Sequence, residues 1–120
     1  MLPKSLKRRF GNKGEDVAVE LLKKNGYRII ERNFSGKFGE IDIVAQDGTT
    51  LVFVEVKTRK DMRYGMPQEA VTKSKLYKIK KTAEYYSLLH PELPKKLRID
   101  VVGLIINGEV LEYSKIFKVY

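Results

Sequence analysis

Cysteine is absent from this chain of 120 residues, and histidine occurs only once. Without thiols there can be no disulfide scaffold, no thiolate zinc site and no cysteine nucleophile. A single imidazole cannot build a His-rich metal site or serve a mechanism that needs two histidines. Any bound metal would therefore be held mainly by oxygen atoms, which favours magnesium, manganese or calcium over zinc.

Long hydrophobic runs are missing too. No apolar stretch approaches the roughly 18 residues of a membrane-spanning helix, and none of signal-peptide length follows the basic N-terminus. We therefore expect a cytoplasmic protein with no membrane partner. Acidic residues are outnumbered, 15 against 24 Lys and Arg, which gives a net charge of +9. That charge attracts polyanions and makes nucleic acid the expected partner, although many small proteins are basic for solubility alone.

The length suits a single domain over residues 1–120, with residues 1–10 as a basic N-terminal arm. Hydrophobic periodicity and turn signals predict an α/β fold in the order α-β-β-β-α-β-β, with a mixed sheet flanked by helices. The long helix before the fourth strand allows that strand to lie parallel to the third through a right-handed crossover. The predicted helices are 13–25 and 73–89, and the predicted strands are 27–34, 40–46, 50–58, 97–106 and 109–112.

Two carboxylates stand inside apolar strands, Asp42 in the second and Glu55 in the third. Isolated buried charges are costly, so such groups need partners or a metal. A two-residue turn at Asp47-Gly48 would put Glu40 opposite Glu55, and a four-residue loop would put Asp42 opposite Glu55. An odd loop would place them on opposite faces. With either even loop, the Asp42 and Glu55 carboxylates share a face and could bind one divalent cation. The alternative interpretation of these two acidic residues is an exposed strand stabilised by cross-strand Glu–Lys pairs.

Glu15 is a third candidate, because it shares a helical stripe with core-facing residues. The alternative is a capping box, in which Asn12 begins the helix and Glu15 bonds back to the cap. Gly11 and Gly14 flank this turn and would allow a close approach of backbone or ligand. Asp100, in the fourth strand beside Arg98, is expected to be a structural anchor.

Basic residues gather near the N-terminus, along the second helix and before the fourth strand. We expect some of them to contact phosphates, and we expect the tyrosines near the second cluster to be half-buried in the core rather than to stack on bases. The residues predicted to bind nucleic acid are Arg8, Arg9, Arg59, Lys73 and Lys75.

Several spaced segments carry a family resemblance: Gly11 with Gly14-Glu15, Gly26-Tyr27, Arg32-Asn33, Gly39–Val44, Val52–Arg59, Glu69–Val71 and Asp100–Val102. Together, from about Lys7 to the C-terminus, they resemble the bacterial YraN family of uncharacterised proteins. That family is similar to the restriction-endonuclease-like superfamily, the PD-(D/E)xK nucleases, and within it to the archaeal Holliday-junction resolvases. The resemblance implies an α-β-β-β-α-β core, here with a C-terminal hairpin strand.

This resemblance also implies a catalytic set of Glu15, Asp42, Glu55 and Lys57. Asp42, Glu55 and the carbonyl of Val56 would bind Mg²⁺ or Mn²⁺ with support from Glu15, while Lys57 would position or activate the attacking water. Ile41 stands where the superfamily motif has proline, a departure that removes no ligand, and Glu40 adds a further carboxylate beside the site.

The function that we expect is a metal-dependent endonuclease acting on DNA, with branched DNA as a candidate substrate. A nucleic-acid-binding module of the same fold without catalysis is one alternative, and a protein-partner or assembly factor with a basic surface is another. A branched substrate would suit a two-fold dimer, for which the C-terminal hairpin, with Val110, Leu111, Ile116 and Phe117, is the candidate surface.

Overall fold

The computed structural model describes the backbone of residues 4–120 and the side chains from residue 13 onward. It contains a mixed α/β arrangement in the predicted order, with one additional short 3-10 helix in the connection before the second long helix. The elements are α1 (Lys4–Lys24), β1 (Arg28–Gly36), β2 (Gly39–Asp47), β3 (Thr50–Arg59), η1 (Pro67–Ala70), α2 (Lys73–Leu89), β4 (Lys96–Asn107) and β5 (Val110–Lys118).

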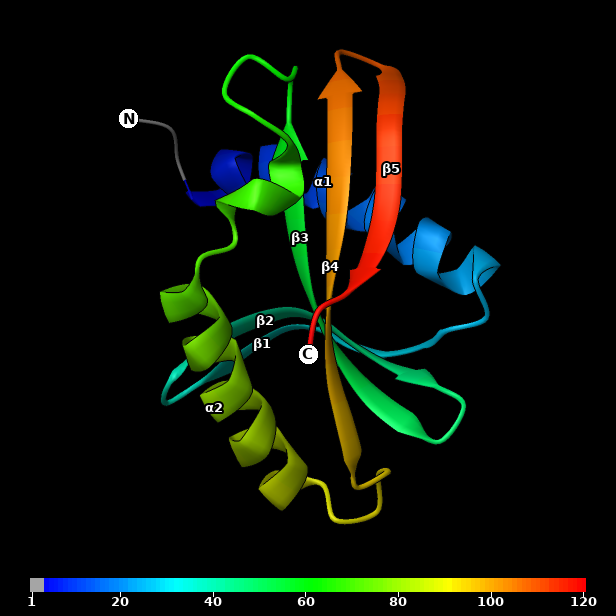
Figure 1. Ribbon diagram of the computed structural model, residues 1–120, viewed down its shortest axis with the longest axis vertical. Coiled ribbons are helices and arrows are strands. Elements are labelled where there is room, and N and C mark those ends of the chain that lie inside the picture. The colour runs from blue at the N-terminus through cyan, green and yellow to red at the C-terminus, as the bar shows by residue number, and fades with distance from the viewer. Residues whose placement is uncertain (1–3) are drawn as a thin grey trace.

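The five strands form one sheet in the order β1-β2-β3-β4-β5. β3 and β4 are parallel and are joined by the connection that contains η1 and α2, whereas the other neighbouring strands are antiparallel. Figure 1 shows α1 behind the sheet and α2 in front of it, beside β1 and β2. The predicted crossover between the third and fourth strands is therefore confirmed.

Each helix buries its apolar stripe in a separate core on its own face of the sheet. Behind the sheet, Leu22 of α1 packs in a cluster that includes Val54 of β3. In front, Tyr86 of α2 packs against Phe53 of β3, with ring centroids 5.7 Å apart in an edge-to-face arrangement. Burial of one such side chain contributes about 1.5–3 kcal/mol, so the two cores hold both helices firmly on the sheet.

The first helix begins earlier than predicted. The backbone is helical from Lys4, so Asn12 lies inside α1. The predicted N-cap at Asn12 is therefore wrong, and so is the alternative of a capping box with Glu15. The predicted arm of residues 1–10 is likewise helical from Lys4, while residues 1–3 lie outside the described residues. The physical reason is that Lys, Leu and Arg, which make up most of this segment, are good helix formers.

Gly14 allows α1 to approach the sheet closely. A Cβ atom at this position would lie 2.2 Å from Oγ1 of Thr58 on β3, which is a severe overlap. The helix ends as predicted at Gly26, whose φ of +86° is the left-handed conformation that glycine favours. No helix among residues 4–120 is long and apolar enough to cross a membrane.

The remaining elements follow the predictions closely, apart from the last strand. α2 begins after Thr72, whose hydroxyl accepts a hydrogen bond from the Lys75 backbone N–H at 3.1 Å. β5 continues to Lys118, well beyond the predicted end, because its alternating side chains let Ile116 pack against the core beneath α1. Val110 and Leu111, at the start of this strand, are exposed.

Candidate active site

The sheet opens between β2 and β3 near its middle. The pairing of these strands runs from Asp47 opposite Thr50 to Ile43 opposite Val54 and stops there. β3 remains paired with β4 as far as Arg59. Figure 1 shows β1 and β2 turning toward α2 while β3 continues upward beside β4. The polar residues that interrupt these two strands lie where they separate.

Asp42 bridges the opening. The next step in the observed register would place it opposite Glu55, because Gln46 lies opposite Leu51. This is the register of the four-residue loop alternative, so the two-residue turn at Asp47-Gly48 and the odd loop are wrong. Instead of a backbone ladder, the Asp42 carboxylate accepts a hydrogen bond from the Val56 N–H at 2.8 Å. Because the N–H and C=O of one strand residue point to the same side, the Val56 carbonyl also faces the opening.

Glu55 is buried, with 6% of its surface exposed, and it is paired with two lysines. Lys75, in the first turn of α2, lies 2.9 Å from its Oε1, and Lys57 lies 3.6 Å from the same oxygen. The neighbouring Lys75 amine and then burial lower the pKa of Lys57. Hydrogen bonds to Lys57 and Glu55 raise the pKa of Lys75. Lys75 therefore holds its proton more firmly than Lys57 does.

Burial raises the pKa of Asp42 to about 7, with further contributions from the charges of Glu55 and Glu15. The hydrogen bond from Val56 and the charge of Lys75 act in the opposite direction but do not cancel this effect. A carboxyl group with this pKa is only partly ionised at neutral pH. A cation placed between Asp42 and Glu55 would favour the charged form of both groups.

Glu15 approaches this pair but is held elsewhere. Its Oε1 lies 3.4 Å from the Arg32 guanidinium, which also pairs with Asp16 at 2.9 Å. In the part of the chain whose side chains are described, no three Asp, Glu or His residues are grouped closely enough to hold a metal ion. Arg32, on β1, was not singled out by the sequence for this role, because nothing in the pattern links it to the first helix.

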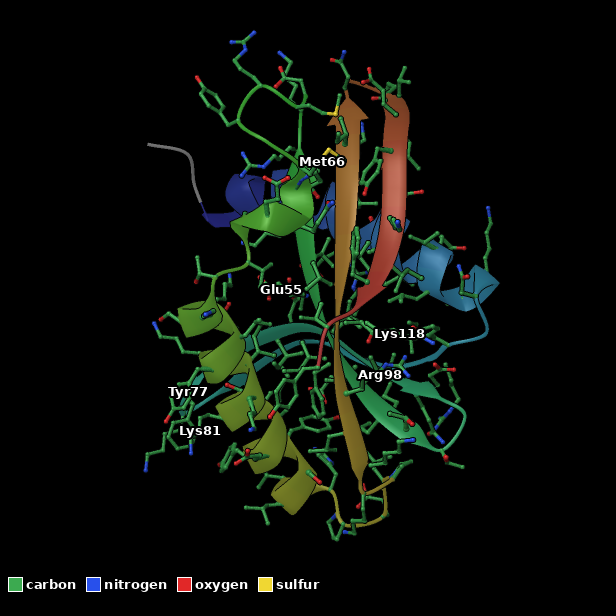
Figure 2. The ribbon with its side chains drawn as sticks, viewed as in Figure 1. Glu55, Met66, Tyr77, Lys81, Arg98 and Lys118 are labelled. Carbon is green, nitrogen blue, oxygen red and sulfur yellow. The ribbon has the colours of Figure 1, made fainter. Side chains whose placement is uncertain are left out.

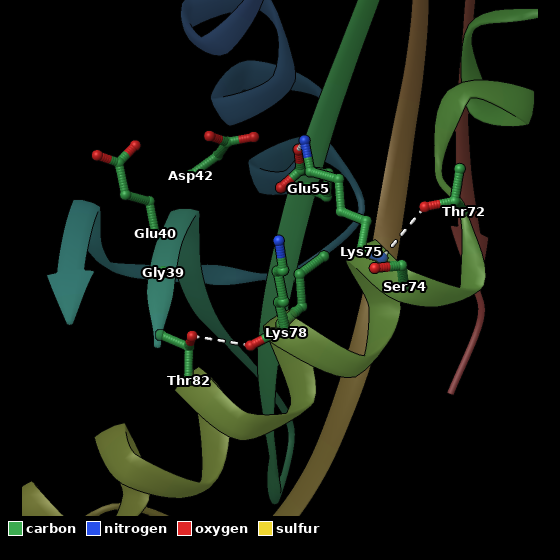
Figure 3. Close-up of a pocket in the computed structure, with 10 residues that line it drawn as sticks. Gly39, Glu40, Asp42, Glu55, Thr72, Ser74, Lys75, Lys78 and Thr82 are labelled. Atoms are coloured by element: carbon green, nitrogen blue, oxygen red, sulfur yellow. Dashed lines mark hydrogen bonds and ion pairs between the residues drawn. The ribbon is translucent and has the colours of Figure 1, made fainter. Parts of the chain in front are cut away.

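Asp42 and Glu55 open onto a cleft of about 440 Å³. β2 forms one wall and the N-terminal half of α2 forms the other. Figure 3 shows Lys75 beside Glu55, with Lys78 rising from α2 toward the same opening. The lining residues are Gly39, Glu40, Asp42, Glu55, Thr72, Ser74, Lys75, Lys78, Ile79 and Thr82.

The residues predicted to bind nucleic acid are distributed unevenly around this cleft. Lys75 lies inside it, whereas Lys73 is exposed at the start of α2 and does not line it. Arg59 follows Glu55 and Lys57 along the same face of β3, and its Nε atom is buried with no hydrogen-bond partner among the described residues. The side chains of Arg8 and Arg9 lie outside the described residues.

The acidic group of the fourth strand belongs to a separate structural network. Asp100 is fully buried and accepts hydrogen bonds from the Tyr27 hydroxyl at 2.6 Å and from Arg98 Nε at 2.8 Å. Arg98 also reaches Asp47, at the β2–β3 turn, at 2.8 Å. Burial and this bond to Asp100 raise the pKa of Tyr27. None of these residues lines the cleft, which supports the structural interpretation of Asp100.

The oxygen atoms at the opening could hold a divalent metal ion. Asp42 and Glu55 supply carboxylates, and the Val56 carbonyl faces the same space. Magnesium binds through one or two carboxylates, keeps several water molecules and completes its shell with substrate phosphates. This donor set fits Mg²⁺ or Mn²⁺ better than zinc, which favours nitrogen and sulfur.

Comparison with known proteins places the chain among bacterial relatives. Residues 14–104 match the model described as "Uncharacterised protein family UPF0102". A UPF0102 protein of Caldicellulosiruptor saccharolyticus is 47% identical over 112 residues, covering 92% of this chain and 95% of the relative. Another, from Symbiobacterium thermophilum, is 50% identical over 97 residues, covering 81% and 82%. On these matches, the chain belongs to the uncharacterised protein family UPF0102, the YraN family.

Proposed function

We propose that this protein is a Mg²⁺- or Mn²⁺-dependent nuclease that hydrolyses phosphodiester bonds in DNA. The observation that carries the proposal is the convergence of Asp42, Glu55 and Lys57 where β2 leaves β3, at the mouth of a cleft with a basic wall. The resemblance of the same residues to the PD-(D/E)xK motif supports it.

Hydrolysis of a phosphodiester requires that charge on the phosphate be neutralised and that a hydroxide be available near neutral pH. Both are the chemistry that an ion bound by Asp42, Glu55 and the Val56 carbonyl would supply. Asp42 is suited to this role because burial, and after it the charge of Glu55, raises its pKa, and a bound cation would favour its ionised form.

The lysines provide the protein's own contribution to the reaction. Lys57 lies on the face of β3 that carries Glu55, and its lowered pKa suits a group that orients the attacking water or accepts its proton. Lys75 pairs with Glu55. A cation held by Glu55 would compete with this ion pair and would leave the Lys75 ammonium free to contact a substrate phosphate. Arg59 continues the same face of β3, and its buried Nε has no partner among the described residues, so its guanidinium is a further candidate for phosphate contact.

The test begins with calorimetric titration of Mn²⁺ into the metal-free protein, alone and with a phosphorothioate DNA that resists cleavage. We expect saturable binding in the wild type and its loss in Asp42→Asn and Glu55→Gln. Glu40→Gln is the matched control, because Glu40 lines the same cleft but is exposed. Absence of Mn²⁺ binding both with and without DNA would refute the proposal.

Cleavage is then measured on duplex, single-stranded and four-way-junction DNA of the same sequence. We expect metal-dependent products in at least one of the three and a loss of at least about 100-fold in Lys57→Ala, as is typical for removal of a general acid–base group. Wild-type protein that binds Mn²⁺ but cleaves none of these substrates would exclude a nuclease acting on DNA.

A second candidate function is nucleic-acid binding without cleavage. It is favoured by the two lysines that already neutralise Glu55 and by Glu15, which pairs with Arg32 instead of completing a metal site. This candidate predicts DNA binding that falls steeply with salt, with a log–log slope of several units, and that does not change when a chelator is added. Together with absent cleavage, that result would favour the binding module.

A further inference from the structure

Large aromatic side chains stand exposed beside the cleft. Phe38, at the tip of the β1–β2 hairpin, is 46% exposed, and Tyr77, on α2, is 62% exposed. The prediction that the tyrosines near the second helix are half-buried is therefore wrong for Tyr77 and for Tyr64, whereas Tyr86 is fully in the core. Exposed aromatic rings contribute little to the core. Two of them near one cleft, Phe38 on the hairpin and Tyr77 on α2, suggest a binding surface.

Tyr77, Lys81 and Tyr85 follow one another at intervals of four residues, so they share one side of α2. Figure 2 shows Tyr77 and Lys81 projecting together from the outer side of this helix. The Lys81 Nζ lies 5.5 Å from the centre of the Tyr77 ring. Phe38 adds a further ring, with its centroid 6.4 Å from that of Tyr85. We call Phe38, Tyr77 and Tyr85, with Lys37 and Lys81, the aromatic ridge.

The aromatic ridge borders the cleft directly. The hairpin tip lies against α2, because a Cβ on Gly36 would be 3.5 Å from the Tyr85 ring and one on Gly39 would be 3.6 Å from Thr82. Gly39 and Thr82 both line the cleft. Gly39 directly follows Phe38 in the sequence, and Thr82 directly follows Lys81. A ligand bound at Asp42 and Glu55 could therefore extend across Gly39 onto the rings.

The charges of the ridge are those of a nucleic-acid surface. The Lys37 Nζ lies over the Phe38 ring, 5.8 Å from its centre, and the Lys81 Nζ lies over the Tyr77 ring at 5.5 Å. Glu84, the acidic residue of α2, lines a different pocket together with Lys80 and Tyr120. The exposed carboxylate nearest to Phe38 in the sequence is Glu40, which lines the cleft and is not part of the ridge. Aromatic rings interleaved with ammonium groups are the combination that binds unpaired bases by stacking and their phosphates by charge.

We propose that the aromatic ridge stacks the unpaired bases of a nucleic-acid strand whose backbone enters the cleft. This inference rests on the proposed function and narrows its substrate to DNA with a single-stranded stretch, such as a flap, a gap or an open junction. Bases inside a duplex present only their edges, so their faces cannot reach Phe38 or Tyr77. On binding, a base takes the ring face, and the lysine above it moves to the neighbouring phosphate.

The test is fluorescence anisotropy of labelled 20-nucleotide strands in chelator, which prevents metal-dependent cleavage and so separates binding from catalysis. The probes are oligothymidine, a strand of the same length made of abasic sites, a duplex, and the RNA equivalent of the first. We expect wild-type protein to bind oligothymidine at least about fivefold more tightly than the abasic strand, since one stacked base contributes about 1–3 kcal/mol.

Phe38→Ala and Tyr77→Ala should each weaken binding to oligothymidine by about tenfold and binding to duplex by less than twofold. Tyr77→Phe should bind like the wild type, and Lys81→Gln should weaken both ligands alike. Tyr120→Ala is the matched control, because Tyr120 is also 62% exposed and also carries a lysine over its ring, Lys80 at 4.7 Å, but lies away from the cleft. It should leave binding to oligothymidine unchanged.

Equal affinity for the abasic strand and oligothymidine would overturn the inference, as would an equal loss in Tyr120→Ala and Tyr77→Ala. These outcomes do not depend on the nuclease proposal, which fails separately if Asp42→Asn and wild type bind Mn²⁺ alike. Preference for the RNA strand would overturn the assignment of the substrate as DNA.

Discussion

Replacing Asp42 with asparagine should stabilise the metal-free protein while removing metal binding. Asparagine has nearly the same shape, and its carbonyl oxygen can still accept the hydrogen bond that Val56 donates to Asp42. What the change removes is a charge that burial and Glu55 disfavour, as the pKa of about 7 indicates. The proposed metal site therefore costs stability, as is common for active sites.

The size and sign of the effect follow from the pKa. Each pKa unit corresponds to 1.36 kcal/mol, so the difference from the ordinary value of 3.8 to about 7 sets an upper limit of about 4 kcal/mol. Partial solvent access reduces this to about 2 kcal/mol. Because folding raises the pKa of Asp42, the protonated carboxyl group contributes to the stability of the wild type. This contribution is fully present below about pH 4 and is lost as the pH rises through about 7.

Urea unfolding of both proteins at pH 4 and pH 8 in chelator measures this directly. We expect the free energy of unfolding of Asp42→Asn, relative to wild type, to rise by about 2 kcal/mol between these pH values. Excess Mn²⁺ at pH 8 should then stabilise only the wild type, since a ligand stabilises the form that binds it. A difference between the two proteins that stays constant with pH would refute the reasoning.

Three further changes test other parts of the structure. Lys75→Gln should bind Mn²⁺ several-fold more tightly in calorimetry, because it removes the ammonium 2.9 Å from Glu55, and should bind DNA more weakly. Gly14→Ala should lower the free energy of unfolding by about 2 kcal/mol through its overlap with Thr58, and Thr58→Ala in the same chain should restore most of it in urea unfolding. Arg98→Ala should cost about 3–5 kcal/mol, because it leaves Asp100 charged and buried, yet Mn²⁺ binding by calorimetry should be unchanged in whatever fraction remains folded.

Most of the fold could be predicted from the sequence because its signals are local. The alternation around Ile43 and Val54, the glycine of the turn at Gly48, and the helix end before Gly26 are each signalled within a short segment. The turn itself lies one residue later than Asp47-Gly48, because Asp47 still pairs with Thr50. The start of α1 could not be read in this way. Asn12 resembles an N-cap, but the helix formers that precede it extend the helix past that signal.

The site was predictable in its residues more than in its geometry. Alternation places Asp42 and Glu55 on neighbouring strands, but the register depends on how the turn between them closes, so three arrangements stayed open. The separation of β2 from β3 beyond Ile43 has no counterpart in hydrophobic periodicity. The partners Arg32 and Lys75 come from β1 and α2, and only packing in three dimensions brings them to Glu15 and Glu55.

The order of the strands in the sheet has a consequence for how the protein folds. Because every strand pairs with its neighbour in the sequence, the chain can add strands one after another, and the link through η1 and α2 is the single long connection between paired strands. Low sequence separation of contacts speeds folding. The hairpin of β2 and β3, which carries Asp42 and Glu55, can close before that connection docks. Its two carboxylates then meet without Lys75, which arrives only with α2, so we expect divalent cations to accelerate the early phase of refolding.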